Sequence, residues 1–493
     1  MTNTVPEAGR ASAAAVRRGR TAFAIVPLAT AQLMITLDST IVSVALPTLQ
    51  ADVGLTDSQR AWAVTAYTLA FGGLLLLGGR LGDLFGRRRA LIIGVVGFAL
   101  SSVVCGAAQN DLMFIGSRGL QGIFAALIAP STLALITTTY TEARERTRAV
   151  GIYAATAMSG GALGLVVGGV LTDYLGWRWC MYVNIPIAVI VVVGSLLSVA
   201  NPPRHPDVKP DVPGAVLVTL GMVGIIYGLG VAGDRGWASG RTVGALVGGV
   251  LVLVAFGWWQ ARTAHPLLPP RVAANRVGAA SFLVMMVAAF CTFGMMLGMT
   301  YQLQTVLGYS PVAAGIAFLG FVGTAVVSST QLGRRLVPHM RPGLMMATGL
   351  VLYALAYLLV TRLTPHSSYW PDVFPPLAVM GVGVGILTVP VVGTVMSVSA
   401  ARDSGVVAAV VNTMQQAGGS VGAALLNTVS ISAAARYLAS RPDNAATRVA
   451  VTVHGFVVSA RWSASIALVC AVLALVAVNV PAPRPGGGAR APK

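Results

Sequence analysis

Residues 21–47 read TAFAIVPLATAQLMITLDSTIVSVALP, an apolar run with a single acid, Asp38, near its middle. The run is long enough to cross a bilayer, which takes about 20 apolar residues in a helix. An ionised side chain at membrane depth is costly by several kcal/mol, so such residues are rare and usually face a bundle interior or a wet cavity. A carboxylate paired only for structure is the simpler alternative. A functional acid is favoured, because an apolar residue replaces a structural acid in lipid with little loss.

The composition of the whole chain agrees with this stretch. Of its 493 residues, 56% are hydrophobic and only 10% are charged, with a mean hydropathy of +0.78, whereas soluble proteins carry about 25% charged residues. The chain is therefore predicted to be an all-α polytopic membrane protein. Its apolar runs predict fourteen transmembrane helices, at residues 21–47, 58–79, 90–109, 112–139, 148–172, 179–200, 212–232, 242–260, 276–303, 311–333, 343–361, 373–397, 405–430 and 455–480.

The formal net charge of +18 comes from 33 Lys and Arg residues against 15 Asp and Glu residues. They lie mostly in short loops and form no dense basic patch interleaved with aromatics, so nucleic-acid binding is not expected. If the chain has fourteen spans, 23 of the Lys and Arg residues fall on the side of the N-terminus, nine fall on the opposite side, and Arg118 lies within a span. Because positive loops stay in the cytoplasm, both termini are predicted to be cytoplasmic. The strong preference for Arg over Lys is typical of a GC-rich bacterial genome, which indicates a bacterial cytoplasmic membrane.

The ends and connections of the chain are not expected to form a further domain. The N-terminal segment is basic and is expected to lead into an uncleaved first span, and the C-terminal PAPRPGGGARAPK is expected to be disordered. The longest connection, residues 431–455, is expected to be an external loop, part of which forms an amphipathic helix. The predicted organisation is a cytoplasmic tail at 1–20, a six-helix bundle at 21–200, a linker with two extra spans at 201–275, a second six-helix bundle at 276–480 and a tail at 481–493.

Residues that carry enzymatic or metal chemistry are scattered. The four cysteines fall in or at the edge of apolar runs without a CxxC pair or a histidine partner, which is typical of small core residues. The five histidines lie on different loops, and the glycines include no phosphate-binding Walker loop. No metal site, cofactor or enzyme activity is therefore expected. A polytopic membrane enzyme and a channel remain as alternatives of other classes.

The loop after the second span, residues 79–91, reads GRLGDLFGRRRAL. It resembles the signature loop of the major facilitator superfamily, with Gly79, Asp83, Gly86, Arg87 and Arg88 at matching positions. The glycines allow a tight turn and close helix approach, while Asp83 can cap a helix or pair with an arginine across the gap between bundles. The resemblance implies that these contacts hold the outward-facing state shut on the cytoplasmic side. A basic loop that obeys the topology rule explains the arginines but not Asp83 and the glycines.

A degenerate copy of this loop, GRRLVPHMRPGL at residues 333–344, keeps the glycine and the basic residues but lacks the acid. Internal duplication into two bundles is therefore expected, as in transporters built from parallel repeats.

The fourth span contains Arg118, within FIGSRGLQGIFAALIAP at residues 114–130. It resembles the family's RxxQG motif, here Arg118, Gln121 and Gly122. A guanidinium stays charged at ordinary pH, so it acts by stabilising a nearby ionised acid such as Asp38 when the two approach, and by releasing it when they part. The alternative is a purely structural ion pair; proton coupling through Asp38 and Arg118 is favoured.

The fifth span contains GGALGLVVGGV at residues 160–170. Its small residues suit tight helix packing, and they resemble the antiporter motif GxxxGPxxGG of exporters in the superfamily. Leu165 stands where that motif has proline, so a kink there is in doubt. Packing alone also explains the pattern, which the glycines Gly160, Gly164, Gly168 and Gly169 form.

Four further stretches, residues 37–47, 177–186, 301–315 and 404–429, resemble the fourteen-spanner drug:proton antiporter branch of the superfamily. The resemblance implies a monomeric, proton-driven exporter of amphiphilic or apolar drugs that confers resistance and rocks one bundle against the other. Its partners are the lipid bilayer, a small-molecule drug and protons, and the two extra spans pack outside the bundles. Export or uptake of one defined metabolite, such as a peptide or siderophore, is the alternative.

A substrate cavity is expected from polar, aromatic and methionine side chains near the middle of the spans. Methionine and aromatic side chains suit loose recognition of varied apolar ligands, although at helical spacing they are more often core. The candidates are Gln32, Met34, Tyr67, Gln121, Phe124, Tyr301, Gln304, Asn412, Met414 and Gln415.

Overall fold

The computed structural model describes residues 23–479 apart from 58, 141, 201–210, 265, 269, 337–338, 399–403, 440–441 and 443–444. No strand occurs in this described part. Thirteen of its helices are long and apolar enough to cross a membrane, and there is a fourteenth span if the two arms of α3 (Trp62–Phe85), bent by 58° between Leu75 and Leu77, are taken together. The predicted all-α polytopic fold is confirmed. Both predicted tails lie outside the described residues.

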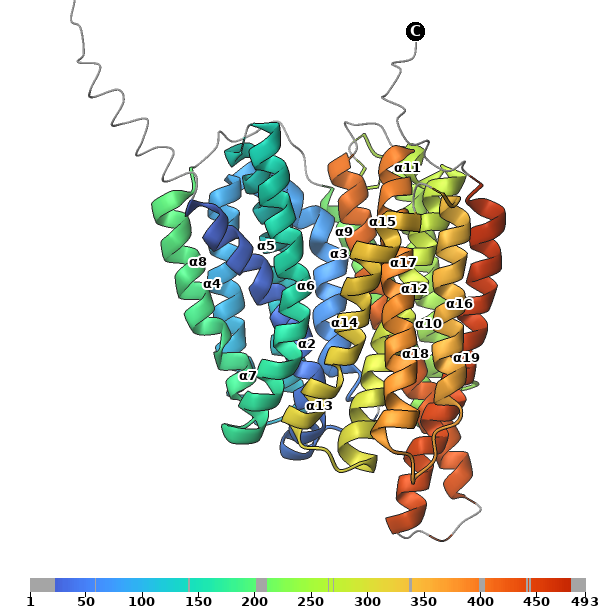
Figure 1. Ribbon diagram of the computed structural model, residues 1–493. Coiled ribbons are helices and arrows are strands. Elements are labelled where there is room, and N and C mark those ends of the chain that lie inside the picture. Colours follow the sequence, from blue (N-terminus) through green and yellow to red (C-terminus); the bar gives the residue numbers. More distant parts are fainter. Residues whose placement is uncertain are drawn as a thin grey trace, which may run out of the picture.

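The first bundle contains the helices of the N-terminal part, drawn from blue to green in Figure 1. In a bilayer, apolar runs of this length satisfy their backbone groups only within helices. The helices are α2 (Ile25–Val53), α3, α4 (Arg87–Gly106), α5 (Asp111–Thr139), α6 (Ala143–Tyr174), α7 (Trp179–Tyr182) and α8 (Asn184–Ser198).

A proline inside α5 shows how closely these helices approach one another. Pro130 has no N–H, so the carbonyl of Ala126 loses its partner within the helix. Gly78 of α3 lies against this carbonyl, and a Cβ at Gly78 would stand 1.9 Å from its oxygen. Only glycine therefore allows α3 to cross α5 at this point.

The second bundle, yellow to red in Figure 1, has the larger hydrophobic core. Its tyrosines Tyr353 and Tyr357 are buried in that core. The elements are α12 (Arg276–Tyr301), η1 (Gln302–Val306), α13 (Pro311–Ala317), α14 (Leu319–Val327), η2 (Ser328–Leu332), α15 (Gly333–Leu336), α16 (Pro342–Val360), η3 (Tyr369–Val373), α17 (Phe374–Ser397), α18 (Ser404–Leu438) and α19 (Ala445–Ala477).

Between the bundles the chain forms a hairpin of α9 (Val212–Arg235) and α10 (Gly240–Arg262), followed by the short α11 (Pro270–Ala273). The buried Asp211 accepts hydrogen bonds from Gly214 N at 2.9 Å, Trp259 Nε1 at 2.8 Å and Gln260 Nε2 at 2.6 Å. The same carboxylate thus caps the start of α9 and holds the end of α10.

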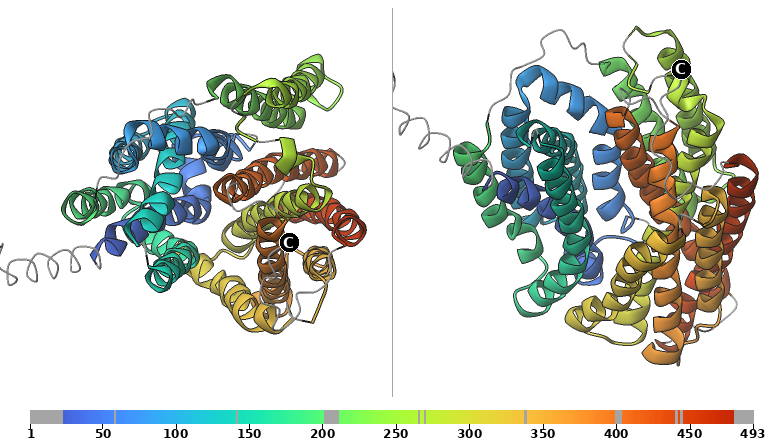
Figure 2. Two further views of the ribbon diagram at one scale, coloured as in Figure 1. Left: turned by 90° about the horizontal axis from the view of Figure 1, so that it is seen from above. Right: turned by 45° about the horizontal axis from the view of Figure 1, so that its top comes forward.

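This hairpin lies at the side of the molecule, where Figure 2 shows it beside both bundles. α9 packs against α3 of the first bundle and α18 of the second, while α10 packs on the outer side of α9. The hydroxyl of Thr428 on α18 donates to Leu229 O of α9 at 2.7 Å. α9 therefore covers one of the seams between the two bundles.

The two ends of the molecule differ in how the bundles meet. We call the end where α2 begins and α3 finishes the near end, at the top of Figure 1, and the opposite end the far end. The described polar contacts between bundles lie at mid-depth or at the far end. At mid-depth, the Thr413 hydroxyl donates to Gly72 O at 3.1 Å. The structure therefore represents a state closed at the far end. That the near end is cytoplasmic stays a prediction.

Several helices end away from the positions expected from the sequence. The connection predicted at residues 431–455 is mostly helical, because α18 runs on to Leu438 and α19 begins at Ala445. The predicted connection is thus helical over more of its length than expected, because alanine-rich, hydrophobic residues continue both helices beyond the apolar core. The sixth span is interrupted at Val183, between α7 and α8, so that Asn184 opens a new helix.

Candidate functional site

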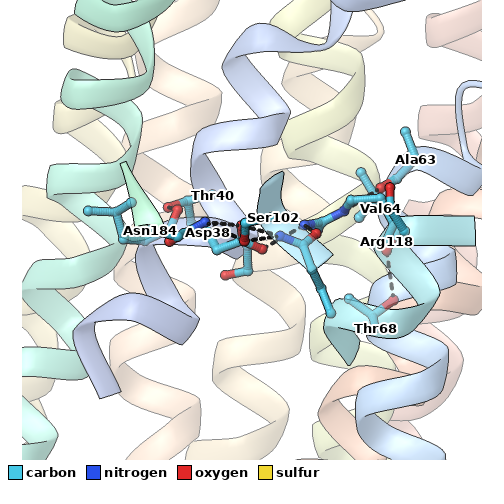
Figure 3. A network of polar contacts seen from close by, with 12 residues as sticks. Asp38, Thr40, Ala63, Val64, Thr68, Ser102, Arg118 and Asn184 are labelled. Atoms are coloured by element: carbon cyan, nitrogen blue, oxygen red, sulfur yellow. Dashed lines mark hydrogen bonds and ion pairs between the residues drawn. The ribbon is translucent and has the colours of Figure 1, made fainter. Parts of the chain in front are cut away.

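A buried ion pair lies inside the first bundle. Arg118 of α5 donates from Nη1 to Asp38 Oδ2 of α2 at 2.6 Å, with Asp38 fully buried and Arg118 1% exposed. Arg118 Nε also donates to Ala63 O of α3 at 3.1 Å. Figure 3 shows this row of contacts crossing the bundle. The structure thus places together the two residues that the sequence predicted as the coupling pair.

Neutral side chains complete the contacts of the carboxylate. Gln121, one turn after Arg118 on α5, donates from Nε2 to Asp38 Oδ1 at 3.3 Å and accepts from Arg118 Nη1 at 2.7 Å. Asn184 donates from Nδ2 to the same Asp38 oxygen at 2.9 Å. Both amides also donate to the hydroxyl of Ser102 on α4, at 2.7 Å and 3.3 Å. We call Asp38, Arg118, Gln121, Asn184 and Ser102 the polar network.

An aromatic ring covers the guanidinium of this network. Tyr67 of α3 is fully buried, and Arg118 Cζ stands 4.5 Å from its ring centroid, within the range of a cation–π interaction. The Tyr67 hydroxyl has no hydrogen-bond partner in the described part of the chain. The ring therefore stabilises the arginine by its face, and the polar end of the tyrosine is left unsatisfied.

The glycines of α6 set the position of α2, and with it the position of Asp38. A Cβ at Gly164 would lie 2.0 Å from Thr40 Oγ1 and 2.8 Å from Leu37 O. Gly160 and Gly168 lie against the same helix, where a Cβ would meet Thr36 and Ile41. These glycines form the predicted packing face.

The fourth glycine, Gly169, does not belong to this face. It lies against α13 of the second bundle, where a Cβ would stand 2.6 Å from Pro311 O. Leu165, in place of the motif proline, is buried at the same contact beside Gly315. α6 is one continuous helix, so the residue at position 165 packs between bundles and does not break the helix.

The loop of residues 79–91 is a compact corner between α3 and α4. Gly86 has φ of +94°, which favours glycine, and Gly79 lies against Pro130. Arg87 Nε donates to Asp83 Oδ1 at 2.9 Å, and Arg88 Nη2 donates to Leu196 O at 3.0 Å. Asp83 thus pairs within its own loop, and no described contact joins it to the second bundle. The gating role of this loop stays a prediction.

The residues proposed for the substrate cavity do not form one group. Met34, Tyr67 and Gln121 are fully buried within the first bundle, and the ring of Phe124 fills the space beside Gly97. These four side chains therefore do not line an open cavity in this structure, because their helices turn them toward neighbouring first-bundle helices.

The remaining candidates lie elsewhere. Gln304 Nε2 reaches across to Val44 O at 2.8 Å. Met414 packs against the second core, and Asn412 and Gln415 are exposed on α18. Gln32 is partly buried, and its Oε1 lacks a partner in the described part of the chain. Their role in substrate binding stays a prediction.

Tyr301 is part of a contact between bundles that the sequence did not reveal. Arg60, in the turn just before α3, donates from Nε to Asn427 Oδ1 at 2.6 Å and lies over the Tyr301 ring at 4.3 Å. Asn427 in turn donates to Asp57 O at 2.8 Å, and the Tyr301 hydroxyl donates to Gln50. Arg60, Tyr301 and Asn427, which also line a pocket at this end, hold the bundles together at the far end.

Two members of the polar network, Asn184 and Ser102, were not predicted. Asn184 lies within residues 177–186, a stretch already singled out as WRWCMYVNIP, where it is the one side-chain amide. A neutral amide in an apolar run is a weak signal, since such residues often only bond between helices.

Two helical bundles, an ion pair buried inside one of them and closure at one end define a membrane transporter of the alternating-access class. The model of the Major Facilitator Superfamily matches residues 28–423, and this chain belongs to that family.

Relatives of known name are similar over nearly the whole chain. The puromycin resistance protein pur8 of Streptomyces alboniger is 44% identical, covering 93% of this chain and 91% of the relative. The cephamycin export protein CmcT of Amycolatopsis lactamdurans is 37% identical, covering 82% and 84%. Among solved structures, a bacterial homolog of the human lysosomal transporter Spinster, in an inward-facing and unoccupied conformation, matches with a TM-score of 0.67 at 15% identity, covering 93% of this chain and 97% of that one.

Proposed function

We propose that this protein is a proton-coupled antiporter that exports an antibiotic or other amphiphilic drugs across the bacterial cytoplasmic membrane and thereby confers resistance. The observation that carries the proposal is the fully buried Asp38–Arg118 pair within the first bundle. The relatives named for resistance to puromycin and export of cephamycin support a drug as the substrate.

The geometry supports a simple coupling step. Proton binding neutralises the Asp38 carboxylate and removes its attraction for Arg118, so the contact at 2.6 Å between α2 and α5 is weakened. Loss of the proton restores the pair and pulls the two helices together again. Because both helices belong to one bundle, the change in charge alters that bundle's shape against the second. The proton gradient supplies the energy, and no cofactor is required.

The closed far end gives the direction. If the near end is cytoplasmic, as the distribution of positive charge predicts, the contacts of Arg60 with Asn427 and Tyr301 close the external side. This structure is then the inward-facing state, ready to take drug from the cytoplasm. Export requires these contacts to break while the near end closes, and the loop in which Asp83 pairs with Arg87 lies at that end.

The test is uphill efflux of a fluorescent amphiphilic dye from proteoliposomes under an imposed pH gradient. We expect the wild type to transport, and Asp38→Asn to fall to the level of empty liposomes while still exchanging dye down its gradient. Asp173→Asn is the matched control, because Asp173 is an exposed carboxylate near the end of α6. Gradient-driven transport by folded Asp38→Asn would show that this acid does not carry the coupling proton.

A narrow substrate range is the second candidate, and the names of the relatives favour it. Pur8 is named for puromycin and CmcT for cephamycin, and a third relative, from Streptomyces glaucescens, is named for tetracenomycin C. Expression in a drug-sensitive host against a broad panel separates the two. Protection against a single compound supports a dedicated exporter, and protection against many unrelated compounds supports a multidrug pump.

A further inference from the structure

Asn184 lies on the opposite side of Asp38 from Arg118, as Figure 3 shows. It is the first residue of α8 and is fully buried. Its Nδ2 donates to Asp38 Oδ1 at 2.9 Å and to Ser102 Oγ at 3.3 Å. Its Oδ1 is buried and accepts no hydrogen bond in the described part of the chain. The Asn184 carboxamide therefore uses its N–H donors, while its Oδ1 oxygen remains available to accept a hydrogen bond.

The unpaired Oδ1 oxygen of Asn184 becomes important when Asp38 binds a proton. An ionised carboxylate only accepts hydrogen bonds, whereas the acid must also donate one, and a buried O–H without an acceptor is costly. Arg118 has no acceptor to offer, and Gln121 Oε1 already accepts from Arg118 Nη1 at 2.7 Å. Among the side chains that hydrogen-bond the carboxylate, only Asn184 has an acceptor free.

We infer that Asn184 is a positioning residue that follows the protonation state of Asp38. It donates through Nδ2 to the ionised carboxylate, and after half a turn of its carboxamide it accepts through Oδ1 from the protonated acid. The proton adds to Asp38 Oδ1 and stays there, so no covalent bond of Asn184 breaks, and its hydrogen bond from Nδ2 is exchanged for one accepted by Oδ1. Ser102 permits the turn, because its hydroxyl accepts from Nδ2 in the first state and donates to Oδ1 in the second.

The surroundings of Asp38 contain few other groups that could produce the same response. The ionisable side chains near it are Arg118 from α5, Tyr67 from α3, Cys105 from α4 and Cys180 from α7. The face of α6 that packs on α2 presents glycines, and α8 contains no ionisable residue. Of these groups, only Arg118 is charged, so a proton taken up here is identified with Asp38.

The inference rests on the proposed proton coupling, and infrared difference spectroscopy of the full-length protein in liposomes, recorded on acidification, tests both. We expect the wild type to show a carboxylic acid band that is absent from Asp38→Asn, at the position of a hydrogen-bonded acid. In Asn184→Leu the same band should move to the higher wavenumber of an acid whose O–H has no acceptor. Asn184→Ala gives the same test if the leucine variant does not fold.

Ser101→Ala is the matched control, because it removes a buried hydroxyl of α4 that donates to Gly97 O at 2.8 Å and leaves every residue of the polar network in place. Its band should stay at the wild-type position. An Asp38 band that is unmoved in both Asn184 variants overturns the role of Asn184 and leaves proton coupling intact. Absence of any Asp38 band in the wild type across the pH range overturns proton binding at Asp38 itself, and the role of Asn184 with it.

Discussion

The cores of the two bundles differ in the kind of polar side chain that they bury. In the second bundle the buried tyrosine hydroxyls are neutral and paired: the Tyr353 hydroxyl bonds to Thr292 at 2.9 Å, and Tyr357 donates to Cys291 O at 2.5 Å. In the first bundle the core contains the Asp38–Arg118 charge pair. The second bundle is thus built to keep one set of contacts, whereas the first contains a group whose partners must change when it titrates.

The distribution of unsatisfied polar atoms shows the same difference. Seven buried side-chain atoms in the described part of the chain lack a hydrogen-bond partner, and six of them belong to the first bundle. Buried polar groups are normally paired, so each such atom is a contact available to another state. Two of these atoms belong to Tyr67 and Asn184, which contact the ion pair, and the excess in the first bundle indicates that this bundle is the part that rearranges.

Breaking the ion pair should have the largest effect on stability. Arg118→Leu leaves Asp38 as a buried charge without its partner, which costs about 3–5 kcal/mol, so we expect a large fall in Tm and in the yield of folded protein. The double variant Asp38→Asn/Arg118→Leu should recover much of the lost Tm, because no unpaired charge remains, and yet fail in gradient-driven transport. Thermal unfolding in detergent measures both. Equal Tm values for Arg118→Leu and the wild type would contradict a structural dependence on the pair.

Close helix packing at glycines should contribute equally to the stability of both bundles. Gly164→Ala places a Cβ 2.0 Å from Thr40 Oγ1, and Gly418→Ala places one 2.0 Å from Met286 O. Each should cost about 1–3 kcal/mol by overpacking, measured as a lower Tm. Gly161→Ala is the control, because nothing lies within 4 Å of its added Cβ. A loss at only one of the two contacts would mean that the bundles differ in packing as well as in charge.

Removing a tyrosine hydroxyl should distinguish the two cores by a small amount. Tyr357→Phe deletes the bond to Cys291 O and leaves that carbonyl with one partner fewer, at a cost of about 1 kcal/mol. Tyr67→Phe deletes a hydroxyl without a partner and keeps the ring over Arg118, so its Tm should equal or exceed that of the wild type. Thermal unfolding of the two variants side by side makes the comparison. The reverse order of stabilities would contradict the assignment of paired and unpaired hydroxyls.

The charged residues were predictable from the sequence because a charge in an apolar run is conspicuous. Asp38 and Arg118 stand in spans that are otherwise apolar or small, and the cost of such residues in lipid implies a partner. Asn184 could not be found in the same way. Its direction depends on the interruption at Val183 between α7 and α8, which periodicity alone does not indicate.

The proposed cavity shows the limit of reading faces from composition. Met34 and Tyr67 were chosen for their chemistry, but the rotation of each helix in the bundle decides which side chains turn inward. That rotation follows from glycine contacts such as Gly164 against Thr40, which involve helices more than a hundred residues apart in sequence. The span count needed no such knowledge, since it depends only on length and hydropathy.

The position of α9 has a consequence for how lipid surrounds the protein. One seam between the bundles, where α3 meets α18, is covered by α9, and the other, where α6 meets α13, has no described helix packed over it. Acyl chains therefore touch the moving boundary directly on one flank only. A relative sliding of the bundles must shear protein against protein at Gly73 and Thr219 on the covered flank, and protein against fluid lipid on the other. Because the hairpin of α9 and α10 covers only one seam, the friction that opposes movement of the bundles differs between the two flanks of the protein.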